Sequence, residues 1–285
     1  MTTTTSPAAT SAVHRLWRVS CGFTLDVTAA CQVVLQVAPA ASAGNRLEES
    51  LVVTLDGAPV PVATMTTAHE GLAQVVSVSE GRLEMSYAAV LGAIGAPVPD
   101  PRRDLDDEQV VYRRQSRYCP SDEMMGFFAQ ELGHLEPGAD RLLAVADWVF
   151  ERLAYEAGAS GPLDTAADAL FAGKGVCRDF AHLAITALRA LGVPARLVAV
   201  YAPGLSPMEF HAVVEAHLDG VWWVLDPTRL APRRSLLRVA TGRDAADTAF
   251  LTVLDGTAEL LANEMTVTID GDLPLDAHED LVPLP

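Results

Sequence analysis

The chain has 285 residues, of which half are hydrophobic and 20% are charged. This composition supplies enough apolar side chains for a substantial core and argues against global disorder. The 37 Asp and Glu residues outnumber the 20 Lys and Arg residues and give a net charge of −17, which excludes nucleic acid and anionic membranes as general partners. No apolar run is long enough to span a bilayer.

The beginning of the chain and its cysteines indicate the compartment. Residues 1–12 lack the basic and apolar regions of a signal peptide, and we expect them to form a disordered tail. The four cysteines, Cys21, Cys31, Cys119 and Cys177, show neither CxxC spacing nor a Cys/His pattern typical of zinc sites. Because thiols stay reduced in the cytoplasm, the sequence predicts a cytoplasmic protein with no disulfide and no metal.

Residues 13–110 are predicted to form an all-β, sandwich-like domain. Short runs rich in Val, Leu and Thr alternate with turn pairs such as Asp56-Gly57, which is typical of strands joined by tight turns. The predicted strands are Phe23–Val27, Gln32–Val37, Leu51–Leu55, Leu72–Ser79 and Arg82–Ala89. We expect His14 and His69 to be exposed bystanders, because no chemical motif accompanies them. Gly95–Asp107, rich in Pro and charge, is the predicted linker.

Helices are predicted next. Cys119 precedes Pro120 and is therefore biased away from helix, while Ser121 or Asp122 is expected to cap a helix at Glu123–Glu131. Cys119 thus lacks a helix-start position and is interpreted as structural. The segments Asp140–Glu156 and Thr165–Phe171 are predicted to be a core helix and a short helix that leads into a Gly-Lys-Gly loop.

The most informative stretch is Gly173–Leu191, GKGVCRDFAHLAITALRAL. Apolar residues recur at helical spacing from Cys177 onward, and a polar stripe opposes them. The polar stripe consists of Arg178, Asp179, His182, Thr186 and Arg189. The cysteine lies in the first turn, where free N–H groups and the helix dipole favour a thiolate. A buried structural cysteine is the alternative for this residue alone.

A predicted strand at Ala195–Tyr201 precedes a β-hairpin in Phe210–Thr228, with Asp219-Gly220 as its turn. This register places Val213 opposite Asp226, and His211 lies two residues along on the same face. A thiol at a helix start, an imidazole and a carboxylate are the parts of an activated cysteine nucleophile. Cys177, His211 and Asp226 are therefore the candidate catalytic residues.

Other residues compete for these roles. His182 lies on the polar stripe of the predicted cysteine helix, and His217 lies at the turn end of the hairpin, far from Asp226. Both are interpreted as ordinary polar residues. Glu215 and Trp222 share the His211 face, and we expect them to have hydrogen-bonding or packing roles.

Three separated blocks, GVCRDFAHL, FHA and WWVLDPT, resemble the bacterial transglutaminase-like superfamily, whose members are often described as cysteine proteases with a papain-like core. Two further segments, YRRQSRYCPSD and ATGRDAADTAF, extend the resemblance from about Tyr112 to Phe250. By this resemblance, Cys177 is the nucleophile, His211 the base and acid, and Asp226 the group that orients the histidine. Residues that could line the cleft or support the triad are Tyr118, Arg178, Asp179 and Arg243.

The sequence therefore predicts an α+β protein, with a papain-like, transglutaminase-like catalytic domain at 111–275 after the β domain, and a tail at 276–285. The expected activity is hydrolysis of a peptide or isopeptide-like amide through a thioester, without a cofactor. Two alternatives remain open. One is a transglutaminase-type acyltransferase with an amine acceptor, and the other is a non-catalytic binding module.

Overall fold

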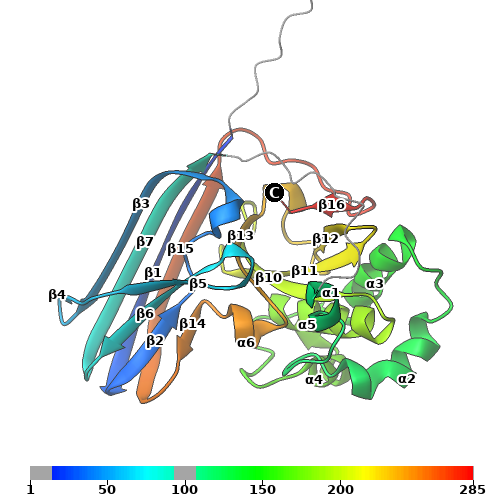
Figure 1. Cartoon of the computed structure of the whole chain (residues 1–285), viewed down its shortest axis with the longest axis horizontal. Helices are drawn as coiled ribbons and strands as arrows, with labels where there is room; N and C mark the ends of the chain where they lie inside the picture. The colour runs from blue at the N-terminus through cyan, green and yellow to red at the C-terminus, as the bar shows by residue number, and fades with distance from the viewer. Residues whose placement is uncertain (1–14, 93–106, 285) are drawn as a thin grey trace, which may run out of the picture.

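The computed structural model describes residues 15–92 and 107–284, which form a β-sandwich beside a mixed lobe of helices and sheet (Figure 1). The α+β fold class is confirmed. The predicted tail at 1–12 and the predicted linker, apart from Asp107, lie outside the described residues. Within the described part of the chain, no helix has the length and hydrophobicity needed to cross a membrane.

Two antiparallel sheets form the sandwich, with strand orders β15-β1-β7-β3-β4 and β14-β2-β6-β5. Their strands within the first part of the chain are β1 (Leu16–Ala29), β2 (Cys31–Leu35), β3 (Asn45–Leu55), β4 (Ala58–Pro59), β5 (Ala63–Thr66), β6 (Leu72–Val78) and β7 (Gly81–Gly92). Alternate residues of β1 and β7 are buried, such as Phe23, Leu25 and Leu83. They meet Val33 and Leu35 of β2 in one core, as the two-residue period of a strand dictates.

The sandwich also contains two strands from late in the chain. β14 (Leu251–Val253) pairs with β2, and β15 (Thr257–Ile269) pairs along β1, with Trp17 opposite Ile269. These residues fall within the catalytic domain predicted at 111–275. The structure places them in the sandwich sheets, because a strand pattern predicts a strand and carries no information about its distant partner.

The mixed lobe is built on a sheet of order β13-β10-β11-β12-β16, with helices packed on it (Figure 1). The strands are β10 (Ala195–Tyr201), β11 (His211–Leu218), β12 (Val221–Leu225), β13 (Leu237–Gly242) and β16 (Val282–Pro283). The helices are α1 (Asp107–Val111), α2 (Ser121–Leu132), α3 (Ala139–Arg152), α4 (Ala166–Ala172), α5 (Cys177–Ala190) and α6 (Ala245–Thr248). A further parallel pair joins β8 (Ala154–Tyr155) to β9 (Lys174–Gly175).

Helix α5 is the centre of this lobe and is buried on every side, which corrects the expectation of a one-sided helix. Its predicted polar stripe is internal because other segments supply hydrogen-bond partners. Arg189 donates to the backbone oxygens of Ala195 and Arg243, and His182 Nε2 accepts the N–H of Ala245 at 3.1 Å. The polar side chains therefore fasten α5 to the segments around it.

Aromatic rings join the two lobes beside the hairpin. Phe210, which precedes β11, stacks on Phe250 with 4.5 Å between ring centroids and on Phe23 of the sandwich at 5.7 Å. The Tyr201 hydroxyl at the end of β10 donates to the carbonyl oxygen of Val37 at 2.7 Å. His211 directly follows Phe210, so its position is coupled to the packing of the sandwich core.

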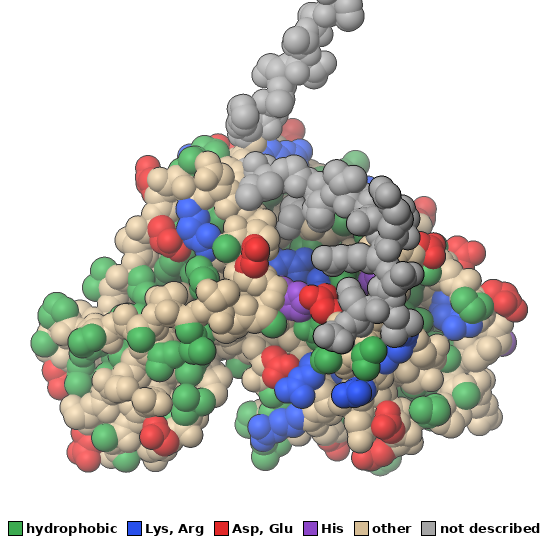
Figure 2. Space-filling view, viewed as in Figure 1, with side chains coloured by type: hydrophobic (Ala, Val, Ile, Leu, Met, Phe, Trp, Pro, Cys, Tyr) green, Lys and Arg blue, Asp and Glu red, His purple; other side chains and the backbone are tan. Residues whose placement is uncertain are grey.

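Charged groups form a second junction between the lobes, and in Figure 2 basic, acidic and histidine side chains meet there. His69 contacts the Tyr112 hydroxyl at 2.7 Å and also lies close to Arg196 and Glu108. The expectation that His69 is an exposed bystander was therefore wrong. Burial, followed by the positive charge of Arg196, lowers the pKa of His69 to about 4, so this histidine is neutral at pH 7.

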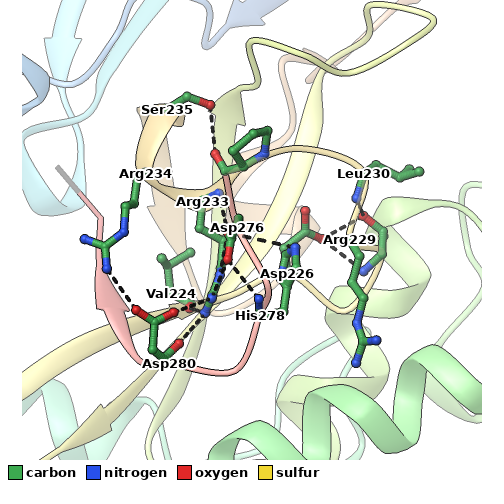
Figure 3. A network of polar contacts seen from close by, with 12 residues as sticks. Val224, Asp226, Arg229, Leu230, Arg233, Arg234, Ser235, Asp276, His278 and Asp280 are labelled. Carbon is green, nitrogen blue, oxygen red and sulfur yellow. Dashed lines mark hydrogen bonds and ion pairs between the residues drawn. The ribbon is translucent and has the colours of Figure 1, made fainter. Parts of the chain in front are cut away.

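The C-terminal segment, predicted to be a tail, is ordered up to Leu284. Strand β16 pairs with β12, and Val282 and Leu284 are buried. Figure 3 shows the polar part of this contact, in which Arg233 binds Asp276 at 2.7 Å and Asp280 at 3.3 Å. The guanidinium of Arg233 is almost fully buried, a state that requires such carboxylate partners. Sequence composition alone did not indicate them.

Candidate active site

The start of α5 is held in a fixed geometry, and Cys177 is its first residue. Asp179, two residues further on, accepts hydrogen bonds from the Val176 N–H at 2.8 Å and the Ser160 hydroxyl at 2.6 Å. A Cβ atom at Gly175 would lie 2.6 Å from the Cβ of Asp179, so this position has space only for glycine. Cys177 is thus presented, half-buried, at the start of the helix, where the first backbone N–H groups have no partner within the helix.

The hairpin β11–β12 has the register that the sequence predicts. Val214 lies opposite Leu225 and Glu215 opposite Val224, with the turn at Asp219-Gly220. As a result, His211 at the start of β11 and Asp226 just after β12 face each other. The His211 Nε2 and Asp226 Oδ2 atoms are 2.9 Å apart, and both side chains are fully buried.

The other carboxylate oxygen of Asp226, Oδ1, also accepts hydrogen bonds. Asp226 Oδ1 accepts from the Thr228 N–H at 3.0 Å and from the Thr228 hydroxyl at 2.7 Å. The loop that follows is anchored to α3, because the Arg229 guanidinium lies 4.1 Å from the centre of the Phe150 ring and pairs with Asp147. The carboxylate is therefore held in one orientation towards His211.

The remaining ring nitrogen of His211 points to its role. Nδ1 forms no hydrogen bond of normal geometry within residues 15–92 and 107–284, and the Cys177 thiol is the group besides Asp226 that interacts with the imidazole. Burial alone would lower the pKa of His211, but the adjacent Asp226 carboxylate, followed by Cys177, outweighs it and raises the pKa to about 10. The same pair lowers the pKa of Asp226, against the effect of its burial. The imidazole can therefore retain a proton at neutral pH.

The four additional residues proposed for the cleft have structural contacts. The buried Tyr118 ring stacks on His182 with 5.2 Å between centroids. Arg178 donates to Ser160 and to the carbonyl oxygen of Gly161, which holds the loop beside the helix start. Asp179 fixes that helix start, as described above.

The fourth residue, Arg243, forms an ion pair with Asp247 at 2.9 Å and not with its neighbour Asp244. Asp244 is itself buried and accepts a hydrogen bond from the backbone N–H of Tyr118 at 3.0 Å. These contacts of Arg243 and Asp244 pin the segment after β13 in place.

The competing residues lie elsewhere. Cys119 is fully buried, and burial raises the pKa of its thiol to about 12, which makes a poor nucleophile at neutral pH. Burial lowers the pKa of His182 to about 3, and His217 packs edge-on against Trp222. Helix α2 begins at Ser121, with Pro120 as its cap residue and no capping side chain, which corrects the predicted cap.

One residue beside Cys177, Tyr155, was not predicted from the sequence. It was included in a helix predicted to run to Glu156, whereas α3 ends at Arg152 and β8 follows. Tyr155 pairs with Gly175 across β8 and β9, and its hydroxyl interacts with the backbone N–H of Cys177. The apolar helical period continues through Ala154, so no local signal marked the change from helix to strand.

No metal site is apparent in the described part of the chain, where no three His, Cys, Asp or Glu side chains come together in a way that could hold an ion. Cys177, His211 and Asp226 bring together a thiol, an imidazole and a carboxylate, the three kinds of group that a cysteine nucleophile uses in acyl transfer.

A family profile described as the transglutaminase-like superfamily matches residues 127–227. The fold is similar to the crystal structure of a "putative cysteine protease" from Cytophaga hutchinsonii, with a TM-score of 0.85 and 30% identity over 94% of this chain and 96% of that one. A segment of 144 residues is 31% identical to the uncharacterized protein ML0607 of Mycobacterium leprae, and the match spans 46% of this chain and 50% of that protein. This chain belongs to the transglutaminase-like superfamily.

Proposed function

We propose that this protein is a cysteine-dependent hydrolase of peptide or isopeptide-like amides that acts through a thioester on Cys177. The observation that carries the proposal is the buried His211–Asp226 pair, 2.9 Å apart, beside a thiol at the start of α5. The similarity to a protein described as a "putative cysteine protease" supports a peptide substrate. The same geometry supports a role of Cys177, His211 and Asp226 as nucleophile, base and orienting group.

The proposed acylation step begins from a thiolate and an imidazolium, in which the proton of the Cys177 thiol already resides on Nδ1 of His211 because the pKa of this histidine is raised. The thiolate attacks the carbonyl carbon of the substrate, and the negative charge that develops on the carbonyl oxygen is stabilised by the N–H of Cys177. The imidazolium of His211 then donates its proton to the amine nitrogen as the C–N bond breaks. A raised pKa suits this role, since the proton stays on the ring until the leaving group needs it.

Deacylation follows the same route in reverse. His211 takes a proton from water, the resulting hydroxide attacks the thioester carbonyl, and the C–S bond breaks to release a carboxylic acid and the thiol. An amine in place of water would give a new amide, which is the reaction of a transglutaminase-type acyltransferase. We favour water because it is always present at the site.

The location proposed for this activity is the cytoplasm, which is supported by four cysteines that are all free thiols. A net charge of −17 disfavours nucleic acid and other polyanions as substrates.

The test is to incubate the whole chain with a library of peptides and amides, with and without added primary amines, and to read product masses. Hydrolysis adds the mass of water to the cleaved substrate, whereas transfer adds the mass of the amine. Cys177→Ala is the matched control, because it removes the thiol and keeps a small side chain. Products formed equally by both proteins, or binding of peptides without any product, would contradict the proposal and favour a binding module.

A further inference from the structure

Tyr155 is held beside the nucleophile by backbone pairing. It lies in β8, and its neighbours Ala154 and Glu156 donate their N–H groups to the carbonyl oxygens of Gly173 and Gly175 at 2.9 and 3.0 Å. Strand β9, which carries Gly175, leads directly into Cys177. The main chain of Tyr155 is therefore fixed relative to the thiol by two hydrogen bonds.

The side chain of Tyr155 lies at the boundary between the site and solvent. Its ring packs against Phe180 of α5 at a centroid distance of 6.0 Å, and the residue is 41% exposed. Its hydroxyl interacts with the backbone N–H of Cys177, the residue two positions after Gly175, with which Tyr155 pairs across β8 and β9. Burial, followed by the negative charges of Cys177 and Glu209, raises the pKa of the phenol to about 12. The hydroxyl is therefore protonated at neutral pH and can donate a hydrogen bond.

The proposed reaction needs such a donor at this place. When sulfur attacks a carbonyl carbon, the carbonyl oxygen becomes an oxyanion, and sites of this kind stabilise it with preorganised hydrogen-bond donors. One donor is the N–H of Cys177, the group with which the Tyr155 hydroxyl interacts. A substrate oxygen that takes up this N–H must displace the phenol oxygen and then lies next to its O–H.

We propose that Tyr155 is the second oxyanion donor. Its hydroxyl lies beside the backbone N–H of Cys177, and it donates a hydrogen bond to the substrate carbonyl oxygen when that oxygen binds to this N–H. The phenol keeps its proton throughout, so the balance of protons between Cys177, His211 and the substrate is unchanged. This assignment rests on the proposed function and adds a catalytic residue to it.

Two chemical probes distinguish an oxyanion donor from a residue that only affects the reactivity of the Cys177 thiol. Iodoacetamide alkylates a thiolate by displacement at a saturated carbon, so no oxyanion forms. p-Nitrophenyl acetate acylates the same thiolate through a tetrahedral oxyanion and releases coloured p-nitrophenolate. Tyr155→Phe removes only the hydroxyl and keeps the ring that packs on Phe180. Tyr87→Phe, in the sandwich, is the matched control for the loss of a tyrosine hydroxyl.

We expect Tyr155→Phe to slow ester acylation of the whole chain by about 100-fold, the usual effect of one oxyanion donor, and to change alkylation less than twofold. Tyr87→Phe should match the wild type with both probes, and thermal melts should show that both variants are folded. Ester acylation of Tyr155→Phe within threefold of the wild type, or an equal loss with both probes, would overturn the assignment. Failure of the proposed function would differ: wild-type acylation would be no faster than that of Cys177→Ala.

Discussion

Glu215 offers a sharp test of the buried electrostatics within the sheet of the mixed lobe, where it lies in β11 and contacts Arg196 of β10 and Arg238 of β13. Its carboxylate is buried and accepts from Arg196 Nε at 2.7 Å and from the Arg238 guanidinium at 2.5 and 3.0 Å. Burial alone would raise the pKa of Glu215, but the charges of Arg196 and Arg238 outweigh it and lower the pKa from 4.5 to about 2. At about 1.4 kcal/mol per pKa unit, this shift corresponds to about 3 kcal/mol of stability.

The sign of the pH dependence follows from the lowered pKa. The stabilisation is complete above pH 4.5, the value of the unfolded chain, and is lost as the pH falls towards 2. Glu215→Gln resembles the protonated carboxyl in shape and charge. We therefore expect it to lower the free energy of unfolding by about 3 kcal/mol at pH 7 and by about 2 kcal/mol at pH 3.5.

Urea denaturation of the wild type and of Glu215→Gln at several pH values measures this difference in the free energy of unfolding. The contributions of all other titrating groups are the same in the two proteins and cancel in the difference. Glu84→Gln is the matched control, since Glu84 is exposed and pairs with an exposed arginine; surface pairs of this kind contribute at most about 1 kcal/mol. A loss below 1 kcal/mol for Glu215→Gln at pH 7, or a difference that does not shrink at low pH, would refute the reasoning.

Three further predictions concern the site and its support. Asp226→Asn should remove the charge that raises the pKa of His211 to about 10, so that an NMR titration finds this pKa closer to 6.5. Ester turnover should fall by about 10⁴-fold, and unchanged turnover would remove Asp226 from the mechanism. Arg233→Met breaks the buried ion pairs of the C-terminal segment and should lower the free energy of unfolding by about 3–5 kcal/mol in urea. Iodoacetamide near neutral pH should label Cys177 before the buried Cys119, as peptide mass spectrometry would show, and the reverse order would contradict the assignment of the nucleophile.

Local patterns predicted the part of the site that local structure determines. Because a two-residue turn fixes the register of a hairpin, Asp219-Gly220 was enough to place His211 opposite the Asp226 end of β12. The start of α5 at Cys177 was predicted because a glycine-rich loop precedes an unbroken helical period.

Features that depend on distant contacts were not predictable from those patterns. The polar residues of α5 have the spacing of a solvated face, and only the segments folded around them make that face internal. Tyr155 continues an apolar helical period, yet the pairing of β8 with β9 ends the helix. Composition likewise suggested disorder at the C-terminal segment, where Arg233 supplies the partner for Asp276.

The pairing of β15 with β1 has a consequence for synthesis on the ribosome. About 165 residues separate the end of β7 from the start of β15, and translation at roughly 5–20 residues per second takes about 10–30 s to produce them. During that time one edge of β1 has no strand to pair with, and an unpaired edge can recruit a strand from another chain. We therefore expect aggregation of the nascent chain to begin at β1 during this interval. A chaperone that prevents this aggregation should bind to the same strand.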